Sequence, residues 1–275
     1  MSATNTTFFN KYILLHTHLE KCGGSTLIHY LETLFGTEYI CDLRPYPPVS
    51  VEQILKHQPD IQKQLRHIKL LTGHIHYDTP WAKLIPNNLW INRFISRPLY
   101  VYFRKKPLYI ASIRHPIDRL ISLFRYVRTR PEHILYDENI KSNNFDSFIQ
   151  KLIQTNSFRV NNEMCTLFIG RGDFLQPLPD AKNAFHHHYF AVMPYNKTLE
   201  FAHLLADVFQ QPMVTESLIN PSDPNETAAP SAATRALLEE KCRNDILFYH
   251  YMMNNYQEKL AQAKRQLEDL CILYR

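Results

Sequence analysis

Two adjacent glycines follow a lysine and a cysteine in the stretch EKCGGST, directly after an apolar run. Small residues let the backbone approach an anion, and the free N–H groups of a helix that begins there point at its oxygens. Ser25 and Thr26 add hydroxyl donors, and Lys21 adds a positive charge. A plain Gly-Gly turn with a serine cap and a surface lysine is the local alternative. A magnesium–ATP loop is disfavoured, because its lysine follows the last glycine.

A second group of candidate residues lies in IRHPIDRLISLFRYVR, where Arg114 ends a predicted strand and Ser122 lies on the following helix. If this strand lies beside the first one, both side chains become donors to a second anion near the glycines. Arg119, Arg125 and Arg128 enlarge the positive field. Solvated positions are favoured for these three, as is usual for charges on helices.

Two strand–turn–helix units position these residues. Residues 11–18 form a short apolar run typical of a buried strand, and a helix is predicted over 25–36, with Gly36 as its stop. The later unit has a strand at 108–113 and a helix that opens at Pro116, where the missing proline N–H has no intrahelical partner.

The rest of the chain continues this alternation. Strands are predicted at residues 68–77 and 190–195, helices around 145–170 and at 199–209, and a long helix from Thr234 to the end, with a break near Asn254–Asn255. Three connecting segments are predicted between these elements. They are a short helix that begins at a Ser50 cap and ends at Leu55, a loop with one hairpin at 78–106, and a polar loop at 217–233. Strands alternating with helices predict the α/β class, with a P-loop-type parallel β-sheet flanked by helices and ligands at the carboxyl ends of the strands.

Composition sets broad limits on function. The chain has 275 residues, is 45% hydrophobic and carries a formal charge of +5, which suits an anionic ligand. No leader-like or long apolar segment is present, so a soluble, cytoplasmic protein is expected, with no transmembrane segment. Five scattered cysteines indicate no disulfide framework and favour a reducing compartment. The run His186–His188 is interpreted as a surface turn, and no metal site is predicted.

At this point the chain resembles the sulfotransferases that use 3′-phosphoadenosine-5′-phosphosulfate (PAPS). EKCGGSTL is similar to the family's 5′-phosphosulfate loop, which implies that Lys21, Cys22, Gly23, Gly24, Ser25 and Thr26 bind the donor. IRHPIDRLISLFRYVR is similar to its 3′-phosphate motif, which adds Arg114 and Ser122. The resemblance implies a single sulfotransferase domain over 1–275, with a donor-binding core at 10–130 and a helical completion of the same domain at 131–275.

Within the family, the branch that includes heparan sulfate 2-O-sulfotransferase is the most similar. GHIHY resembles the piece that carries its catalytic histidine, which places His74 in that role, and RNDILFYHYM resembles a C-terminal helix of the family. The implied reaction moves the sulfuryl group from PAPS to a hydroxyl of a carbohydrate, with Lys21 stabilising the leaving oxygen and no metal. His76 is the rival base, and His16 and His18 follow it.

The implied acceptor is an oligo- or polysaccharide. Two readings are equally open for Trp81, Trp90, Arg93 and Arg97. They form an aromatic and basic groove for the acceptor, or the tryptophans belong to the local core and the arginines are solvated surface charges. The long C-terminal helix is compatible with a homodimer, and no nucleic-acid partner is expected. Two other classes stay open, namely a nucleotide or sugar kinase with an atypical loop and a non-catalytic binding protein for an anionic ligand.

Overall fold

The computed structural model describes residues 3–42, 67–73, 105–137, 140, 144–169, 177–215 and 229–272. These residues contain a sheet of five parallel strands in the order β2-β3-β1-β4-β5. The strands are β1 (Tyr12–Thr17), β2 (Ile40–Asp42), β3 (Leu70–Gly73), β4 (Lys106–Ile113) and β5 (Tyr189–Pro194). The α/β class with a parallel sheet is therefore confirmed.

The strands form because their apolar runs are covered on both faces. Every residue of β1, β3 and β5 is buried, as is typical of parallel sheets between helices. At the end of β1, Thr17 is level with Gly73 on one side and with Ala111 on the other. The carboxyl ends of β1, β3 and β4 therefore meet at one edge of the sheet.

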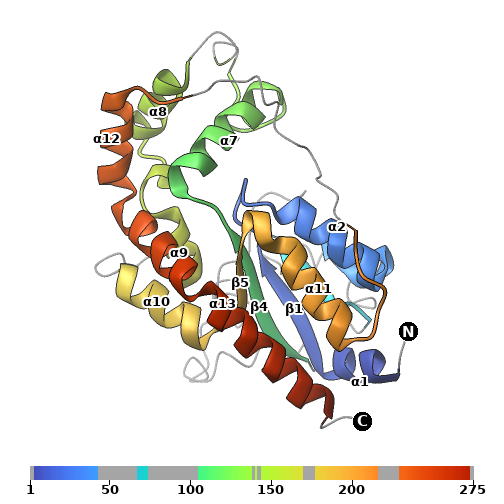
Figure 1. Ribbon diagram of the computed structural model, residues 1–275. Coiled ribbons are helices and arrows are strands. Elements are labelled where there is room, and N and C mark those ends of the chain that lie inside the picture. The colour runs from blue at the N-terminus through green and yellow to red at the C-terminus, as the bar shows by residue number, and fades with distance from the viewer. Residues whose placement is uncertain are drawn as a thin grey trace, which may run out of the picture.

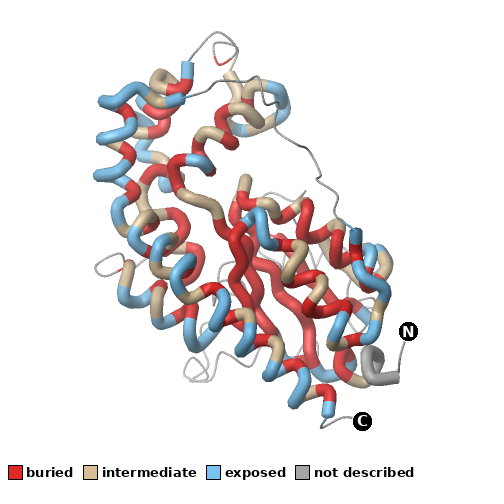
Figure 2. The backbone as a smooth tube through the Cα atoms, viewed as in Figure 1, coloured by how far each residue is buried: buried red, intermediate tan, exposed pale blue. Residues whose placement is uncertain are grey.

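Helices cover both faces of the sheet, as Figure 1 shows. The helices are α1 (Ala3–Lys11), α2 (Gly24–Phe35), α7 (Pro116–Arg128), α8 (Phe145–Gln154), α9 (Glu163–Ile169), α10 (Pro177–His187), α11 (Thr198–Val208), α12 (Ala232–Lys241) and α13 (Arg243–Ile272), with 3-10 turns η1 (Thr37–Tyr39), η4 (Phe158–Val160) and η5 (Tyr195–Lys197). One core packs α1, α2 and α11 against the sheet, and another packs α9 and α10 against the opposite face. The buried residues in Figure 2 trace these two cores.

A third core lies beyond the carboxyl ends of the strands and joins α7, α8, η4 and α12, which we call the helical lobe. The apolar residues of α7 fall at helical spacing, with Leu120, Leu123, Phe124 and Val127 all buried. This face anchors α7 in the helical lobe while its first residue, Pro116, continues closely from β4. The helical lobe therefore stands next to the edge where the strands end.

The C-terminal helix differs from the sequence prediction. The helical run is interrupted at Cys242, between α12 and α13, and α13 continues unbroken through Asn254 and Asn255. The Asn255 side chain donates to the carbonyl of Tyr251, at 2.7 Å, which keeps it compatible with a helix. A regular strip of buried residues continues on both sides of the asparagines, so packing on β5 and α10 overrides their low helix propensity.

Some elements were missed and some predictions lie outside the described residues. The helix α1, the short edge strand β2 and the helix α10 were not predicted, although Phe8 and Phe9 of α1 are fully buried. The predicted Ser50 helix, nearly all of the 78–106 segment and most of the 217–233 loop lie outside the description. Within the part of the chain that is described, no helix has the length and apolar character needed to cross a membrane.

Candidate functional site

The turn between β1 and α2, together with the first residue of α2, is here called the glycine loop (residues 18–24). Lys21 and Gly23 both have left-handed backbone conformations, with φ of 66° and 78°. The first helical hydrogen bond joins the Leu27 N–H to the Gly23 carbonyl, at 3.0 Å. Because Gly23 at the N-cap has no side chain, it cannot cap the N–H groups of the first turn of α2.

Close packing explains why two glycines stand here. A Cβ on Gly24 would lie 2.2 Å from Nδ1 of His18, and a Cβ on Gly23 would lie 3.0 Å from the carbonyl oxygen of Tyr195. Gly23 also needs its positive φ, which L side chains rarely adopt. Gly23 therefore lets the loop backbone approach Tyr195, the residue after β5, and Gly24 leaves room for the His18 ring.

The second candidate turn lies beside the glycine loop, because β4 pairs with β1. Arg114 follows the last residue of β4, and its backbone N–H donates to the buried thiol of Cys22. Burial raises the pKa of this thiol to about 12, which makes Cys22 a packing residue of the loop. Ser122 lies two turns further on in α7, where its own side chain is buried.

The side chain of Arg114 is only partly satisfied. Its guanidinium carbon lies 4.5 Å from the ring centroid of Tyr195, the residue that follows β5. Its buried Nε has no hydrogen-bond partner among the residues that the structure describes. Buried donors are normally paired, so this one marks a position where an acceptor group would be favourable.

Lys21 points toward the helical lobe. Its ammonium nitrogen lies 3.8 Å from the ring centroid of Tyr126 on α7. Burial lowers the pKa of Lys21; the Glu20 carboxylate opposes this shift, and the guanidinium groups of Arg114 and Arg130 add to it. The amine is thus held in a partly dry and positively charged environment, which an anionic ligand would relieve.

Glu20 attaches the glycine loop to the helical lobe. One carboxylate oxygen is 3.0 Å from Nε2 of His133 and the other is 3.4 Å from a guanidinium nitrogen of Arg159. Burial alone would raise the pKa of Glu20, but the His133 hydrogen bond and the Arg159 charge lower it to about 2. Arg159 is itself held by Arg119, which donates to the Arg159 carbonyl at 2.9 Å and forms an ion pair with Glu163.

The predicted solvation of the α7 arginines was wrong for Arg119. This side chain is 3% exposed, and its charge is paired inside the protein rather than added to a surface field. Arg125 and Arg128 are half-buried. The helical period placed Arg119 on a polar face, but η4 and α9 pack over it and supply a carbonyl and a carboxylate.

The predicted histidines divide into two groups. His74 and His76 lie outside the described residues, as do Trp81, Trp90, Arg93 and Arg97. The last described residue before them, Gly73, accepts a hydrogen bond from the His18 N–H at 2.8 Å, so β3 ends beside the glycine loop. His16 and His18 are buried, and Nδ1 of His16 is 2.8 Å from the Thr72 hydroxyl.

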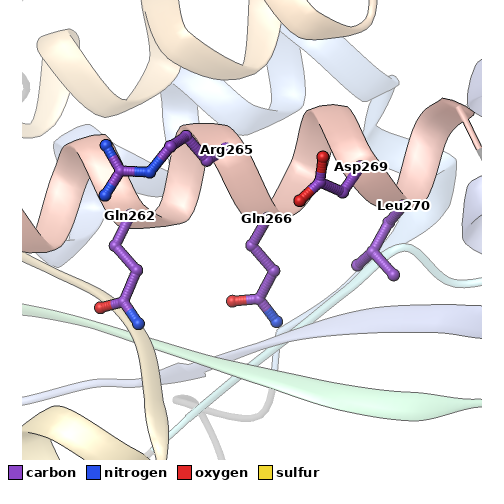
Figure 3. Close-up of a pocket in the computed structure, with 5 residues that line it drawn as sticks. All are labelled: Gln262, Arg265, Gln266, Asp269 and Leu270. Atoms are coloured by element: carbon purple, nitrogen blue, oxygen red, sulfur yellow. The ribbon is translucent and has the colours of Figure 1, made fainter.

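The His186–His188 run is exposed, as predicted, but His186 and His187 belong to the last turn of α10 and His188 lies in the turn that follows it. In the described ranges, no group of three or more His, Cys, Asp or Glu side chains is placed to hold a metal ion. A surface depression elsewhere is lined by residues of the C-terminal part of α13, which Figure 3 labels: Gln262, Arg265, Gln266, Asp269 and Leu270. None of these residues belongs to the glycine loop or to the turn after β4.

Five residues of the site were not found by sequence reasoning: Glu20, Tyr126, His133, Arg159 and Tyr195. Tyr126 had a usable signal, because it lies four residues after Ser122 and therefore on the same helix face. The other contacts join segments that are far apart in the chain. His133 and Arg159 are 113 and 139 residues from Glu20, so no local pattern could have paired them.

The chain belongs to the sulfotransferase family, whose family model matches residues 4–252. Sulfuryl transfer is therefore its general chemistry, and the glycine loop with Arg114 is the part of the described structure that best suits an anionic donor. A comparison with individually curated proteins gave no match.

Proposed function

We propose that this protein transfers the sulfuryl group of PAPS to a hydroxyl of a carbohydrate acceptor, in the manner of the heparan sulfate 2-O-sulfotransferase branch. The observation that carries the donor part is the buried, unpaired Nε of Arg114 beside the glycine loop. Two turns with donor groups at neighbouring strand ends suit a ligand with two separate anionic groups, and PAPS is the donor that this family uses.

In this proposal the donor spans the two turns. The backbone from Lys21 to Gly24 and the hydroxyls of Ser25 and Thr26 bind the 5′-phosphosulfate, with Cys22 packed beneath. Arg114 and Ser122 bind the 3′-phosphate. Apart from the packing residue Cys22, the residues fit this assignment in charge and type, since each is a donor, a cation or a glycine that allows close backbone approach. One domain spanning 1–275 would carry the whole site.

Sulfuryl transfer needs positioning and charge stabilisation more than covalent help from the protein. The acceptor oxygen forms a bond to sulfur while the bond between sulfur and the bridging phosphate oxygen breaks. Lys21 offsets the negative charge that develops on the bridging oxygen, which leaves with adenosine 3′,5′-bisphosphate (PAP). His74, the residue after Gly73, takes the proton of the acceptor hydroxyl, because imidazole titrates near neutrality.

The test compares two variants that remove different steps. His74→Ala should lower turnover by about a hundredfold or more with PAP affinity nearly intact, because a base acts on the acceptor in the transition state. Lys21→Ala should also lower turnover, with at most a modest loss of PAP affinity. Turnover is measured by transfer of labelled sulfate from PAPS to oligosaccharides with free uronic acid or hexosamine hydroxyls, and affinity by calorimetry with PAP.

The outcomes separate the parts of the proposal. If His76→Ala abolishes turnover and His74→Ala does not, the base assignment is wrong while the sulfotransferase activity stands. If neither histidine matters, the likeness to the 2-O branch fails. Tight binding of ATP in place of PAP would contradict the donor itself and favour a kinase.

A further inference from the structure

Tyr126 presents the face of its ring to the Lys21 ammonium at 3.8 Å from the ring centroid. We propose that Tyr126 is a positioning residue that holds Lys21 in its charged form beside the glycine loop, ready for the donor. The face of an aromatic ring carries negative potential, so it attracts an ammonium and offers nothing comparable to a neutral amine.

The charges around Lys21 act on its proton in both directions. Glu20 faces it from its own loop, beside the neutral Cys22 thiol, while Arg114 faces it from the end of β4 and Arg130 from the segment after α7. The Glu20 carboxylate already contacts His133 and Arg159. Burial and the two guanidinium groups favour loss of the proton from Lys21, while Glu20 favours its retention; the ring acts in the same direction as Glu20.

The geometry of the backbone fixes this contact. Lys21 has a φ of 66°, which is unfavourable for a residue with a side chain, and the residue immediately before it, Glu20, is anchored by its carboxylate to His133 and Arg159. Tyr126 lies one helical turn after Ser122 on α7, whose opposite side is buried in the helical lobe. The ring therefore has a fixed position next to the proposed 3′-phosphate site.

The Tyr126 ring has other neighbours, so a test must distinguish a partner for the Lys21 charge from a simple apolar cover. The Tyr126 centroid is 5.5 Å from the Arg130 guanidinium carbon and 5.8 Å from the His133 ring centroid. A purely apolar cover for these groups would work equally well with an aliphatic side chain. A partner for the Lys21 charge requires an aromatic ring, with or without its hydroxyl.

The experiment measures the reactivity of the Lys21 amine directly. Wild-type protein, Tyr126→Phe and Tyr126→Leu are labelled briefly with acetic anhydride across a pH series, and the Lys21 peptide is quantified by mass spectrometry. The exposed Lys241 serves as an internal reference. Acetic anhydride acylates the neutral amine only, so the labelling rate at a given pH reports the fraction of Lys21 that has lost its proton.

Tyr126→Leu should label Lys21 about fivefold faster than wild type near neutral pH, equivalent to about 1 kcal/mol of lost cation–π stabilisation, with the labelling curve displaced to lower pH. Tyr126→Phe should label close to the wild-type rate, because it keeps the ring. Equal labelling of the leucine and phenylalanine variants would overturn the proposal, as would a Lys21 curve that does not move in Tyr126→Leu.

The catalytic consequence rests on the proposed function and is tested separately. If Lys21 must be charged during transfer, Tyr126→Leu should lose turnover at alkaline pH first, and Tyr126→Phe should retain more of it. A shifted labelling curve with no change in the pH profile of transfer would leave the Tyr126–Lys21 contact standing and would count against the role assigned to Lys21 in the reaction.

Discussion

Replacing Arg114 by alanine should weaken PAP binding by about 30- to 150-fold. The buried Nε of this residue has no described hydrogen-bond partner, so an anion that binds there gains a charge-assisted hydrogen bond in a partly desolvated site. Such bonds contribute about 2–3 kcal/mol, and each 1.36 kcal/mol is tenfold in affinity. The contact with the Tyr195 ring helps to keep the guanidinium in place before the ligand arrives.

The assay is isothermal titration calorimetry with PAP on wild type, Arg114→Ala and Arg114→Lys. The lysine variant keeps a charge but loses the fixed fork of donors, so an intermediate affinity is expected. Arg265→Ala, on the exposed side of α13, is the matched control for loss of one positive charge (Figure 3). Affinity within about twofold of wild type for Arg114→Ala, with thermal unfolding unchanged, would show that Arg114 does not contact the donor.

Two further predictions concern the glycine loop itself. Gly24→Ala places a methyl group 2.2 Å from Nδ1 of His18, so we expect the free energy of unfolding to fall by about 1–3 kcal/mol and PAP binding to weaken. An unfolding midpoint equal to that of wild type would mean that the His18 ring moves aside. Glu20 has its pKa lowered to about 2, so its stabilising contribution is present above pH 4.5 and is lost as the pH falls toward 2. Glu20→Gln should be less stable than wild type by up to about 3 kcal/mol at pH 7 and nearly equal to it at pH 2. Urea unfolding at several pH values measures this difference, and a pH-independent gap would contradict it.

The sequence by itself determined the local units of this protein. The apolar run before the glycine loop, the helical spacing after it and the stop at Gly36 all depend on residues a few positions apart. The same holds for β4 and α7, where Pro116 marks the start of the helix. Two such units predicted a parallel α/β sheet, and the observed sheet confirms this prediction. It could be predicted because apolar strands and amphipathic helices are recognised from residues close together in the sequence.

Only the tertiary structure decided which distant groups meet. Nothing in the order of the chain pairs Glu20 with His133 and Arg159, or buries Arg119 beneath η4 and α9. The unbroken path of α13 was likewise decided by packing against β5 and α10 rather than by its asparagines. Contacts of this kind depend on how whole elements dock. A propensity of a few tenths of a kcal/mol per residue is easily outweighed by the burial of one large side chain.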